Sequence, residues 1–254
     1  MSKSNGKVAV ITGATGGIGF EVAKRLGNDG FTVILNGIDD EAGAERLKEL
    51  AADGITAEYY GFDVTDEHAV TSNINKIGEK YGKIDVLVNN AGGLGGRSRF
   101  EEMTTEFYKF VMALNLDSTF YASRAAIPFL KKSDYASIIN YTSNAGWNAG
   151  GPGAGIYGTS KAGVPAITRA LAKDLAEYGI RVNAVSPGTI DTPFHAQIKS
   201  TKPEVFASWA NNIMLGRLGQ PKDVAGVVSF LAGKDSAFLT AETIQVGGGQ
   251  ALGI

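Results

Sequence analysis

Tyr157 and Lys161 are the residues of this sequence whose types and spacing most directly suggest chemistry. They lie four residues apart in an amphipathic stretch, so they share one face of a predicted helix. A free tyrosine has a pKa near ~10 and is a poor base at neutral pH. A neighbouring ammonium favours the phenolate and lowers that pKa. The pair could therefore move a proton to or from the oxygen of a carbonyl or an alcohol.

A glycine-rich loop near the N-terminus is a second candidate site. Residues 13–19, Gly-Ala-Thr-Gly-Gly-Ile-Gly, follow a short apolar run and precede a helical pattern. In a dinucleotide-binding turn, Gly13 would let the chain turn, Gly17 would leave room for a pyrophosphate, and Gly19 would let the helix pack closely. The helix N-terminus would offer its N–H groups to the phosphates. The spacing is Gly-x₃-Gly-x-Gly, so at this point a purely structural turn is an open alternative.

The elements that must position these residues alternate between strands and helices. Short apolar runs predict strands at 7–12, 31–35, 56–62, 84–88, 136–141, 181–185 and 243–246. Amphipathic patterns predict helices at 18–28, 40–53, 67–81, 104–130 (with a bend), 157–178 and 221–232, with a polar loop region before the last of them. We expect one α/β domain over residues 1–254, a doubly wound (Rossmann) parallel sheet of about seven strands with helices on both faces. A TIM barrel would also alternate, but the glycine loop argues against it.

The composition excludes several classes of protein. The chain has 254 residues with 24 Lys+Arg and 26 Asp+Glu, a net charge of −2, which argues against nucleic-acid binding through a broad basic field. There is no cysteine, hence no disulfide framework, no thiolate metal site and no cysteine nucleophile, and we expect no bound metal. No apolar stretch is long enough for a membrane span and no signal core is visible, so we expect a cytoplasmic protein without membrane partners.

Three motifs together resemble the short-chain dehydrogenase/reductase family. They are the glycine loop with Thr12 before it, Asn89-Asn90-Ala91-Gly92 after the fourth apolar run, and Tyr157-x₃-Lys161. The resemblance covers nearly the whole chain and implies hydride transfer between a nicotinamide cofactor and a carbonyl or secondary alcohol. Tyr157 would be the acid/base, Lys161 would tune it and hold the ribose, and Ser143 would bind the reacting oxygen. Asn115, in an apolar helical run, would kink the helix and support a water relay to the lysine.

The resemblance also implies a set of cofactor-binding residues: Gly13, Thr15, Gly16, Gly17, Ile18, Gly19, Gly37, Ile38, Asp63, Val64, Asn90, Ala91, Gly92, Tyr157, Lys161, Pro187, Gly188, Ile190 and Thr192. Aligned with the family, Gly37 takes the place of the acid that selects NAD, and Ile38 takes the place of the arginine that selects NADP. No phosphate-binding cation is visible, whereas Asp39 and Asp40 would repel a phosphate or would simply cap the next helix. We therefore expect NAD(H) to be favoured over NADP(H).

The substrate is expected to be a small polar molecule, such as a sugar or a uronate-derived keto acid. Candidate contacts come from the loops beyond the strand ends: Arg97, Arg99, Asn144, Trp147, Asn148, Phe194, His195 and Lys199. A 3-oxoacyl-carrier-protein reductase is the alternative, and its acidic partner would need basic residues near the site, for which Lys131, Lys132, Arg169 and Lys173 are candidates. A non-catalytic nicotinamide-sensing module is an alternative of another class, although it would not need to retain Tyr157 and Lys161. The resemblance further implies a homotetramer packed through the helices at 104–130 and 157–178.

Glycine is over-represented, with 34 of 254 residues, about 13% against a typical ~7%. Much of the excess falls in the first loop, after the fourth strand at 92–96, between 146 and 158, and at 247–249. The group between 146 and 158 is denser than a cofactor site requires. We expect it to shape or gate a substrate pocket.

Overall fold

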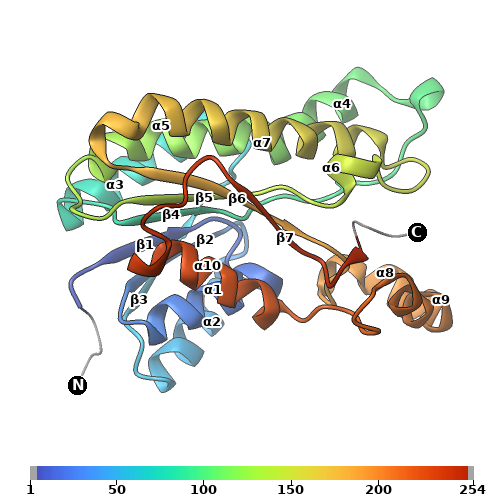
Figure 1. Ribbon diagram of the computed structural model, residues 1–254, viewed down its shortest axis with the longest axis horizontal. Helices are drawn as coiled ribbons and strands as arrows, with labels where there is room; N and C mark the ends of the chain where they lie inside the picture. Colours follow the sequence, from blue (N-terminus) through green and yellow to red (C-terminus); the bar gives the residue numbers. More distant parts are fainter. Residues whose placement is uncertain (1–4, 251–254) are drawn as a thin grey trace.

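The computed structural model describes residues 5–250, and the ends of the expected domain, residues 1–4 and 251–254, lie outside the described residues. Within residues 5–250, seven strands form one sheet in the order β3-β2-β1-β4-β5-β6-β7, and every neighbouring pair is parallel (Figure 1). The strands are β1 (Val8–Ile11), β2 (Thr32–Gly37), β3 (Ala57–Gly61), β4 (Val86–Asn89), β5 (Ser137–Tyr141), β6 (Arg181–Pro187) and β7 (Thr243–Val246). The expected doubly wound fold is confirmed.

Helices connect the strands and cover both faces of the sheet. The longer ones are α1 (Gly17–Asn28), α2 (Asp40–Ala52), α3 (Glu67–Tyr81), α4 (Thr105–Met112), α5 (Ser118–Leu130), α7 (Gly155–Leu175) and α10 (Pro221–Ala232). Shorter turns are η1 (Phe100–Glu102), η2 (Ala113–Asp117), α6 (Ala145–Asn148), η3 (Ala176–Tyr178), η4 (Pro193–His195), α8 (Ala196–Thr201), α9 (Pro203–Ser208), η5 (Trp209–Asn212) and η6 (Lys234–Ser236). Figure 1 shows α1, α2 and α10 on one face of the sheet and α3, α5 and α7 on the other.

Each face of the sheet is sealed by its own apolar core. Under α1 and α10, the side chains of Val22, Leu26 and Val228 pack on alternate residues of β1, β2 and β4. Under α3 and α5, Ile74 and Phe129 pack on the opposite set of strand residues. Strands buried on both faces read as continuous apolar runs, which is why their positions could be predicted. The sheet order reverses between β1 and β4, and at such a switch point the loops beyond the strand ends leave a crevice.

The prediction of a polar loop region between the sixth strand and the last helix was wrong. The chain there forms α8 and α9 with η4 and η5 around them. These turns are short, and Phe206 is buried against His195 and Trp209, so aromatic packing within this segment stabilises them. The strand β5 ends at Tyr141 as predicted, two residues before Ser143, whereas β3 ends at Gly61, one residue earlier than predicted and two residues before Asp63. Nowhere in residues 5–250 does a helix combine the length and the apolar character that crossing a membrane requires.

Candidate active site

The glycine loop between β1 and α1 packs so closely at Gly13 and Gly19 that neither position has room for a side chain. A Cβ at Gly19 would lie 2.3 Å from the carbonyl oxygen of Gly13, and a Cβ at Gly13 would lie 2.9 Å from the Cα of Ala91. Gly13 and Gly17 have left-handed φ angles of 62° and 54°, which favour glycine. No side chain caps the N-terminus of α1. The loop is therefore a close-fitting backbone cradle that leads into an uncapped helix end.

Polar side chains from neighbouring strands brace this loop. The Asn90 side chain donates to the carbonyl oxygens of Thr12 and Gly13 at 3.0 and 2.9 Å, and the Thr12 hydroxyl accepts from the Asn90 N–H. Asn36, at 2% exposure, accepts from the Gly13 N–H at 3.3 Å and donates to the Phe62 carbonyl at 2.9 Å. Asn36 was missed by sequence reasoning. Its signal was a polar residue within an apolar strand run, where a buried amide needs partners.

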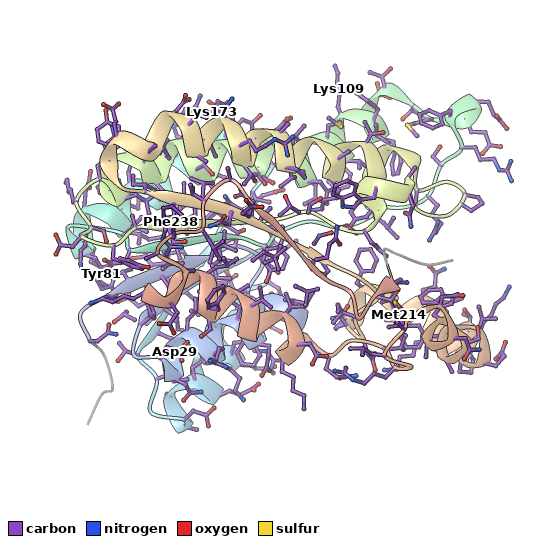
Figure 2. The ribbon with its side chains drawn as sticks, viewed as in Figure 1. Asp29, Tyr81, Lys109, Lys173, Met214 and Phe238 are labelled. Atoms are coloured by element: carbon purple, nitrogen blue, oxygen red, sulfur yellow. The ribbon has the colours of Figure 1, made fainter. Side chains whose placement is uncertain are left out.

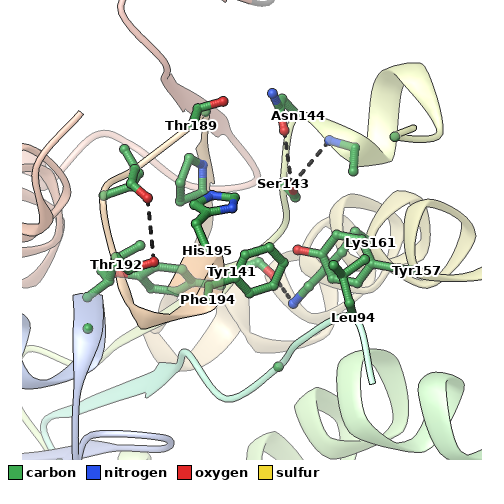
Figure 3. Close-up of a pocket in the computed structure, with 18 of the residues that line it drawn as sticks. Leu94, Tyr141, Ser143, Asn144, Tyr157, Lys161, Thr189, Thr192, Phe194 and His195 are labelled. Atoms are coloured by element: carbon green, nitrogen blue, oxygen red, sulfur yellow. Dashed lines mark hydrogen bonds between the residues drawn. The ribbon is translucent and has the colours of Figure 1, made fainter. Parts of the chain in front are cut away.

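Ser143, Tyr157 and Lys161 come together in a pocket of about 450 Å³ that the glycine loop closes at its other end (Figure 3). The Lys161 ammonium is 4% exposed and donates to the carbonyl oxygen of Tyr141 at 3.0 Å. The Ser143 hydroxyl accepts from the Ala145 N–H at 3.1 Å and donates to the Asn144 side-chain oxygen at 3.2 Å. Residues that lie apart in the sequence thus share one cavity at the carboxyl ends of β4, β5 and β6, where open α/β sheets bind ligands.

The ionisation of this cluster differs from the expectation for Tyr157. Burial raises the pKa of the Tyr157 phenol, and a hydrogen bond with Ser143 offsets only part of that effect. Burial also lowers the pKa of Lys161 from 10.5 to about 8. The lysine side chain points to the Tyr141 carbonyl, and the pKa of Tyr157 in the cofactor-free protein is raised by burial, whereas the spacing of the two residues led us to expect a lowered pKa.

Asn115 lies in a π-helical turn, η2, which joins α4 to α5 and accounts for the expected bend. Its side chain is fully buried and is bonded on both sides to the backbone of Gly93, at 2.8 Å as donor and 2.9 Å as acceptor. It also donates to the Val111 carbonyl at 3.0 Å. A Cβ at Gly92 would lie 2.7 Å from the Asn115 oxygen and 2.8 Å from the Lys161 nitrogen. Asn115 therefore fixes the chain after β4 beside the lysine.

The loop after β6 forms another wall of the pocket. Pro187, Gly188, Ile190 and Thr192 all line it, as expected. The Gln250 side chain makes two hydrogen bonds to this loop. Its oxygen accepts from the Thr189 N–H at 2.8 Å, and its nitrogen donates to the Thr189 hydroxyl at 2.9 Å. A Cβ at Gly188 would lie 2.7 Å from the Gln250 oxygen. Sequence reasoning missed Gln250 because no local pattern links it to residues about sixty positions earlier.

Several of the expected cofactor residues lie outside the lining that the described residues give this pocket: Thr15, Gly37, Ile38, Asp63, Val64 and Ala91. A Cβ at Gly37 would lie 2.6 Å from the Thr15 methyl group, and Ile38 is 81% exposed. Asp39 caps α2 by accepting from the Ala42 N–H, as its structural alternative required.

One cation that the sequence did not reveal lies beside Thr15. The Arg46 side chain donates to the Thr15 carbonyl at 3.2 Å, stacks over the Phe20 ring, and is paired with Glu49. Its charge is thus already countered by a carboxylate of the same helix.

The part of the pocket where we expected the substrate is formed by side chains. Arg97, Asn144, Phe194 and His195 line it, together with Leu94. Burial lowers the pKa of His195, which favours the neutral imidazole; the carboxylate of Asp191 offsets part of this effect, and the nearby Arg97 adds to it. Four other candidates lie outside the pocket lining as the described residues form it: Arg99, Trp147, Asn148 and Lys199. Lys199 instead pairs with Asp191 at 2.7 Å.

The basic residues expected to receive a carrier protein lie away from the pocket mouth. Lys131 and Lys132 follow α5 and precede β5, so they lie near the amino end of this strand, whereas Ser143 lies beyond its carboxyl end. Lys173 is twelve residues along α7 from Lys161, about 18 Å at the rise of an α-helix, and Figure 2 shows it near the far end of α7. Lys131 lies over the Tyr178 ring, 3.5 Å from its centre. These cations do not form a basic rim around the site.

The residues present fit a dinucleotide cofactor. The cradle at Gly13 and Gly19 leaves only backbone at the surface, and the first-turn residues of α1 line the same pocket as Lys161. A diphosphate would therefore meet unhindered N–H groups and the positive end of a helix. Among residues 5–250, no group of three or more acidic or histidine side chains is arranged to hold a metal ion.

Comparison with known proteins agrees with this architecture. A family model described as enoyl-(acyl carrier protein) reductase matches residues 13–251. A diacetyl reductase [(S)-acetoin forming] of Staphylococcus aureus is 42% identical over 97% of this chain and 98% of its own length. The aldohexose dehydrogenase structure from Thermoplasma acidophilum has a TM-score of 0.87 with 32% identity, covering 98% of this chain and 95% of that one. A short-chain type dehydrogenase/reductase from Mycobacterium ulcerans has a TM-score of 0.91 with 27% identity, covering 100% and 92%.

These matches run from the glycine loop to the chain end and span the relatives almost completely. The similarity thus extends to every segment that contributes to the pocket. The chain belongs to the short-chain dehydrogenase/reductase family, and is an oxidoreductase of the carbonyl/alcohol class.

Proposed function

We propose that the protein transfers hydride between a nicotinamide cofactor, with NAD(H) preferred, and a small polar carbonyl compound or its alcohol. One observation carries this proposal: Ser143, Tyr157 and Lys161 converge in the pocket whose other end is the glycine cradle. When bound, the nicotinamide supplies or accepts the hydride. Tyr157 gives the proton to the carbonyl oxygen or takes it from the alcohol, and Ser143 binds that oxygen.

Lys161 and Asn115 support this proton transfer. Lys161 lies beside Gly92 in the pocket wall, where it can hold the cofactor ribose and, as an ammonium, favour the Tyr157 phenolate. Because burial raises the pKa of Tyr157 in the free protein, we infer that phenolate formation awaits the positive charge that the oxidised cofactor brings. Asn115 fixes the backbone of Gly93 beside the lysine through two hydrogen bonds. In this position it would support the water relay that carries protons to the lysine.

The preference for NAD(H) is supported by the chemistry around Thr15. A ribose 2′-phosphate needs an unpaired cation, whereas Arg46 is engaged by Glu49 and Ile38 offers no charge. The pyrophosphate would bind at the glycine loop, against Gly13, Gly16, Gly17, Ile18 and Gly19. We assign the adenosine side to Thr15, Gly37, Ile38, Asp63, Val64, Asn90, Ala91 and Gly92, and the nicotinamide side to Pro187, Gly188, Ile190 and Thr192.

The substrate class is inferred from the pocket walls. Arg97, Asn144 and His195 offer hydrogen bonds, while Leu94 and Phe194 offer apolar walls, which suits a sugar or a keto acid. The structural similarity to an aldohexose dehydrogenase supports this class. A small diketone is the second candidate, supported by the 42% identity to a diacetyl reductase. The positions of Lys131, Lys132 and Lys173, away from the pocket mouth, weigh against a carrier-protein substrate.

We also propose that residues 1–254 form one domain of a cytoplasmic homotetramer. Exposed aromatic side chains on α4 and α5, including Tyr108, Phe110 and Phe120, leave an apolar surface that a second copy could cover. Light scattering of the purified protein tests the tetramer.

The deciding experiment is a paired assay with NADH and NADPH across keto-uronates, diacetyl and acetoacetyl thioesters, with aldoses and acetoin tested against NAD⁺ and NADP⁺. The proposal expects turnover of a small polar substrate with a higher kcat/KM for the non-phosphorylated cofactor. Comparable rates with NADPH would contradict the cofactor preference, and turnover of the thioester alone would contradict the substrate class.

Tyr157→Phe tests the assignment of the acid/base. Loss of the phenol removes the proton donor without changing the ring, so kcat should fall by about 10²–10⁴-fold. Cofactor affinity, measured by fluorescence titration with NADH, should stay within a few-fold of the wild-type value. A Phe variant that turns over as fast as the wild type would show that Tyr157 is not the acid/base.

A further inference from the structure

Arg97 is a cation in the pocket wall that has no carboxylate partner within residues 5–250. It lines the pocket, and none of the ion pairs in this part of the chain includes it. Its guanidinium makes one hydrogen bond to the described chain, from Nη1 to the Pro152 carbonyl oxygen at 2.9 Å. An arginine side chain carries several further N–H donors in one plane and no acceptor. These donors are available to an anion in the pocket.

Two loops hold Arg97 in its place before any ligand binds. The bond to Pro152 joins the loop after β4 to the loop before α7, and next to it the Ser98 N–H donates to the Gly153 carbonyl oxygen at 3.0 Å. A Cβ at Gly153 would lie 3.1 Å from the Cβ of Arg97, so the two loops are in direct contact. Because the arginine is already anchored, less conformational entropy is lost when a ligand binds to it.

The charge around the pocket also favours an anion. Within the described chain, no aspartate or glutamate lines the pocket, whereas Lys161 and Arg97 do. Asp191 is the carboxylate whose charge reaches His195, and it lies outside the lining and is paired with Lys199 at 2.7 Å. A negatively charged group in the pocket therefore meets positive charge without a competing acid.

A wall of aromatic rings connects the proposed acid/base to this arginine. The ring centres of Tyr157 and Phe194 lie 6.1 Å apart, and those of Phe194 and His195 lie 4.9 Å apart (Figure 3). His195 is in turn close enough to Arg97 for the charge of the arginine to act on it. The arginine and Tyr157 thus lie at different places along one wall. This separation suits a substrate whose charged group and carbonyl are several carbon atoms apart.

We propose that Arg97 binds the carboxylate of the substrate, so that the pocket selects keto acids and hydroxy acids over neutral sugars and diketones. The inference rests on the proposed function and names the substrate class of that same site. A guanidinium presents pairs of N–H groups that match the two oxygens of a carboxylate, so a bidentate contact fixes orientation as well as affinity. With the carboxylate on Arg97, Tyr157 and Ser143 act on the carbonyl further along the molecule.

Arg97→Met and Arg99→Met form a matched pair of variants. Arg99 is two residues further along the same loop but is not part of the pocket lining that the described residues form. Both variants remove one positive charge from this loop, so a general loss of electrostatic attraction would affect them alike. Loss of a direct carboxylate contact would affect Arg97→Met alone. Arg97→Lys keeps the charge but loses the paired N–H groups.

The measurement is a calorimetric titration of the full-length protein, saturated with NAD⁺, with 5-keto-gluconate and with its methyl ester. NAD⁺ has no hydride to give to the keto group, so binding is measured without reduction of the ligand. We expect the wild type to bind the acid about ten-fold or more tightly than the ester, because hydrogen bonds between charged groups are the stronger ones. Arg97→Met should abolish this preference, Arg97→Lys should retain part of it, and Arg99→Met should leave it within about two-fold of the wild-type value.

Equal affinity of the wild type for the acid and the ester would overturn the proposal. So would an equal loss of both ligands in Arg97→Met, since Arg97 would then only support the loop, or an effect of Arg99→Met as large as that of Arg97→Met. Failure of the proposed function looks different: no keto compound would be reduced with NADH, or Tyr157→Phe would retain wild-type turnover, whatever the preference for the acid.

Discussion

The two ends of the pocket are built by different means. The glycine end is backbone from one continuous segment, packed so closely that a Cβ at Gly19 would lie 2.3 Å from the Gly13 oxygen. The opposite end is made of side chains from separate segments: Arg97 follows β4, Asn144 follows β5 and His195 follows β6. Backbone presents the same groups whatever the sequence, which suits a shared cofactor. Side chains on separate loops can vary one at a time, which suits substrate choice.

Glycine is abundant at both ends for different physical reasons. In the first loop, Gly13 and Gly19 prevent collisions with backbone. Between 146 and 158, only Gly150 and Gly151 line the pocket, so the expectation that this whole group shapes the pocket holds for part of it. Gly158 instead lets α6 sit on α7, because a Cβ there would lie 2.7 Å from the Cα of Ala149.

A substitution at Gly19 is the strongest test of whether the glycine end of the pocket depends on close backbone packing. Gly19→Ala forces a methyl group onto the Gly13 oxygen and the Asn90 amide, and we expect a loss of about 3 kcal/mol in the free energy of unfolding. NADH affinity should fall at least ten-fold as the cradle shifts. Urea unfolding and fluorescence titration measure the two effects.

Gly16→Ala is the matched control in the same loop. A Cβ at Gly16 meets no described atom within 4 Å, and its backbone is extended, so stability should change by less than about 0.5 kcal/mol. Equal losses in both variants would mean that the cradle is not held by close backbone contact at Gly19.

Lys161 lies where the two ends meet, and its burial predicts a pH-dependent effect. Burial lowers its pKa from 10.5 to about 8, so the unfolded chain holds this proton more tightly, and its contribution to stability rises as the pH passes from 8 to 10.5. Lys161→Met should therefore stabilise the cofactor-free protein at pH 7 by about 2 kcal/mol, less than the full ~3 kcal/mol because the bond to the Tyr141 carbonyl is lost.

The gain from Lys161→Met should shrink as the pH rises from 8 towards 10.5, and turnover should be lost at every pH. Tyr157 is present in both proteins, so its own titration cancels in the difference. Thermal unfolding across this pH range measures the effect, and a gain that does not depend on pH would contradict a buried, destabilised ammonium.

The same contrast between the two ends explains what the sequence could predict. The strands, most helices and the glycine loop depend on local patterns, and Tyr157 and Lys161 share one helix, so their placement in one pocket followed from spacing. A bend at Asn115 was predicted, because the resemblance implies a kink where an amide interrupts an apolar helical run, whereas its π-helical form was not.

What could not be predicted depends on contacts between distant segments. Gln250 meets Thr189 and Asn144 only after β5, β6 and β7 are in register. The turns α8 and α9 are too short for a periodic pattern, and burial of Phe206 stabilises them. The raised pKa of Tyr157 follows from its depth in the fold, which spacing alone does not encode.

The smallest expected effect separates the substrate end from the cofactor end. Gly153 has a left-handed φ of 78°, and a Cβ there would lie 3.1 Å from the Cβ of Arg97, so Gly153→Ala should cost about 1 kcal/mol of stability. It should also displace Arg97 and raise the substrate KM a few-fold, with NADH affinity unchanged. Gly151→Ala, whose nearest described neighbour is the Arg97 guanidinium at 3.8 Å, should leave stability within about 0.5 kcal/mol of the wild type. Weaker NADH binding in Gly153→Ala would mean that the two ends are coupled through this loop and are not independent.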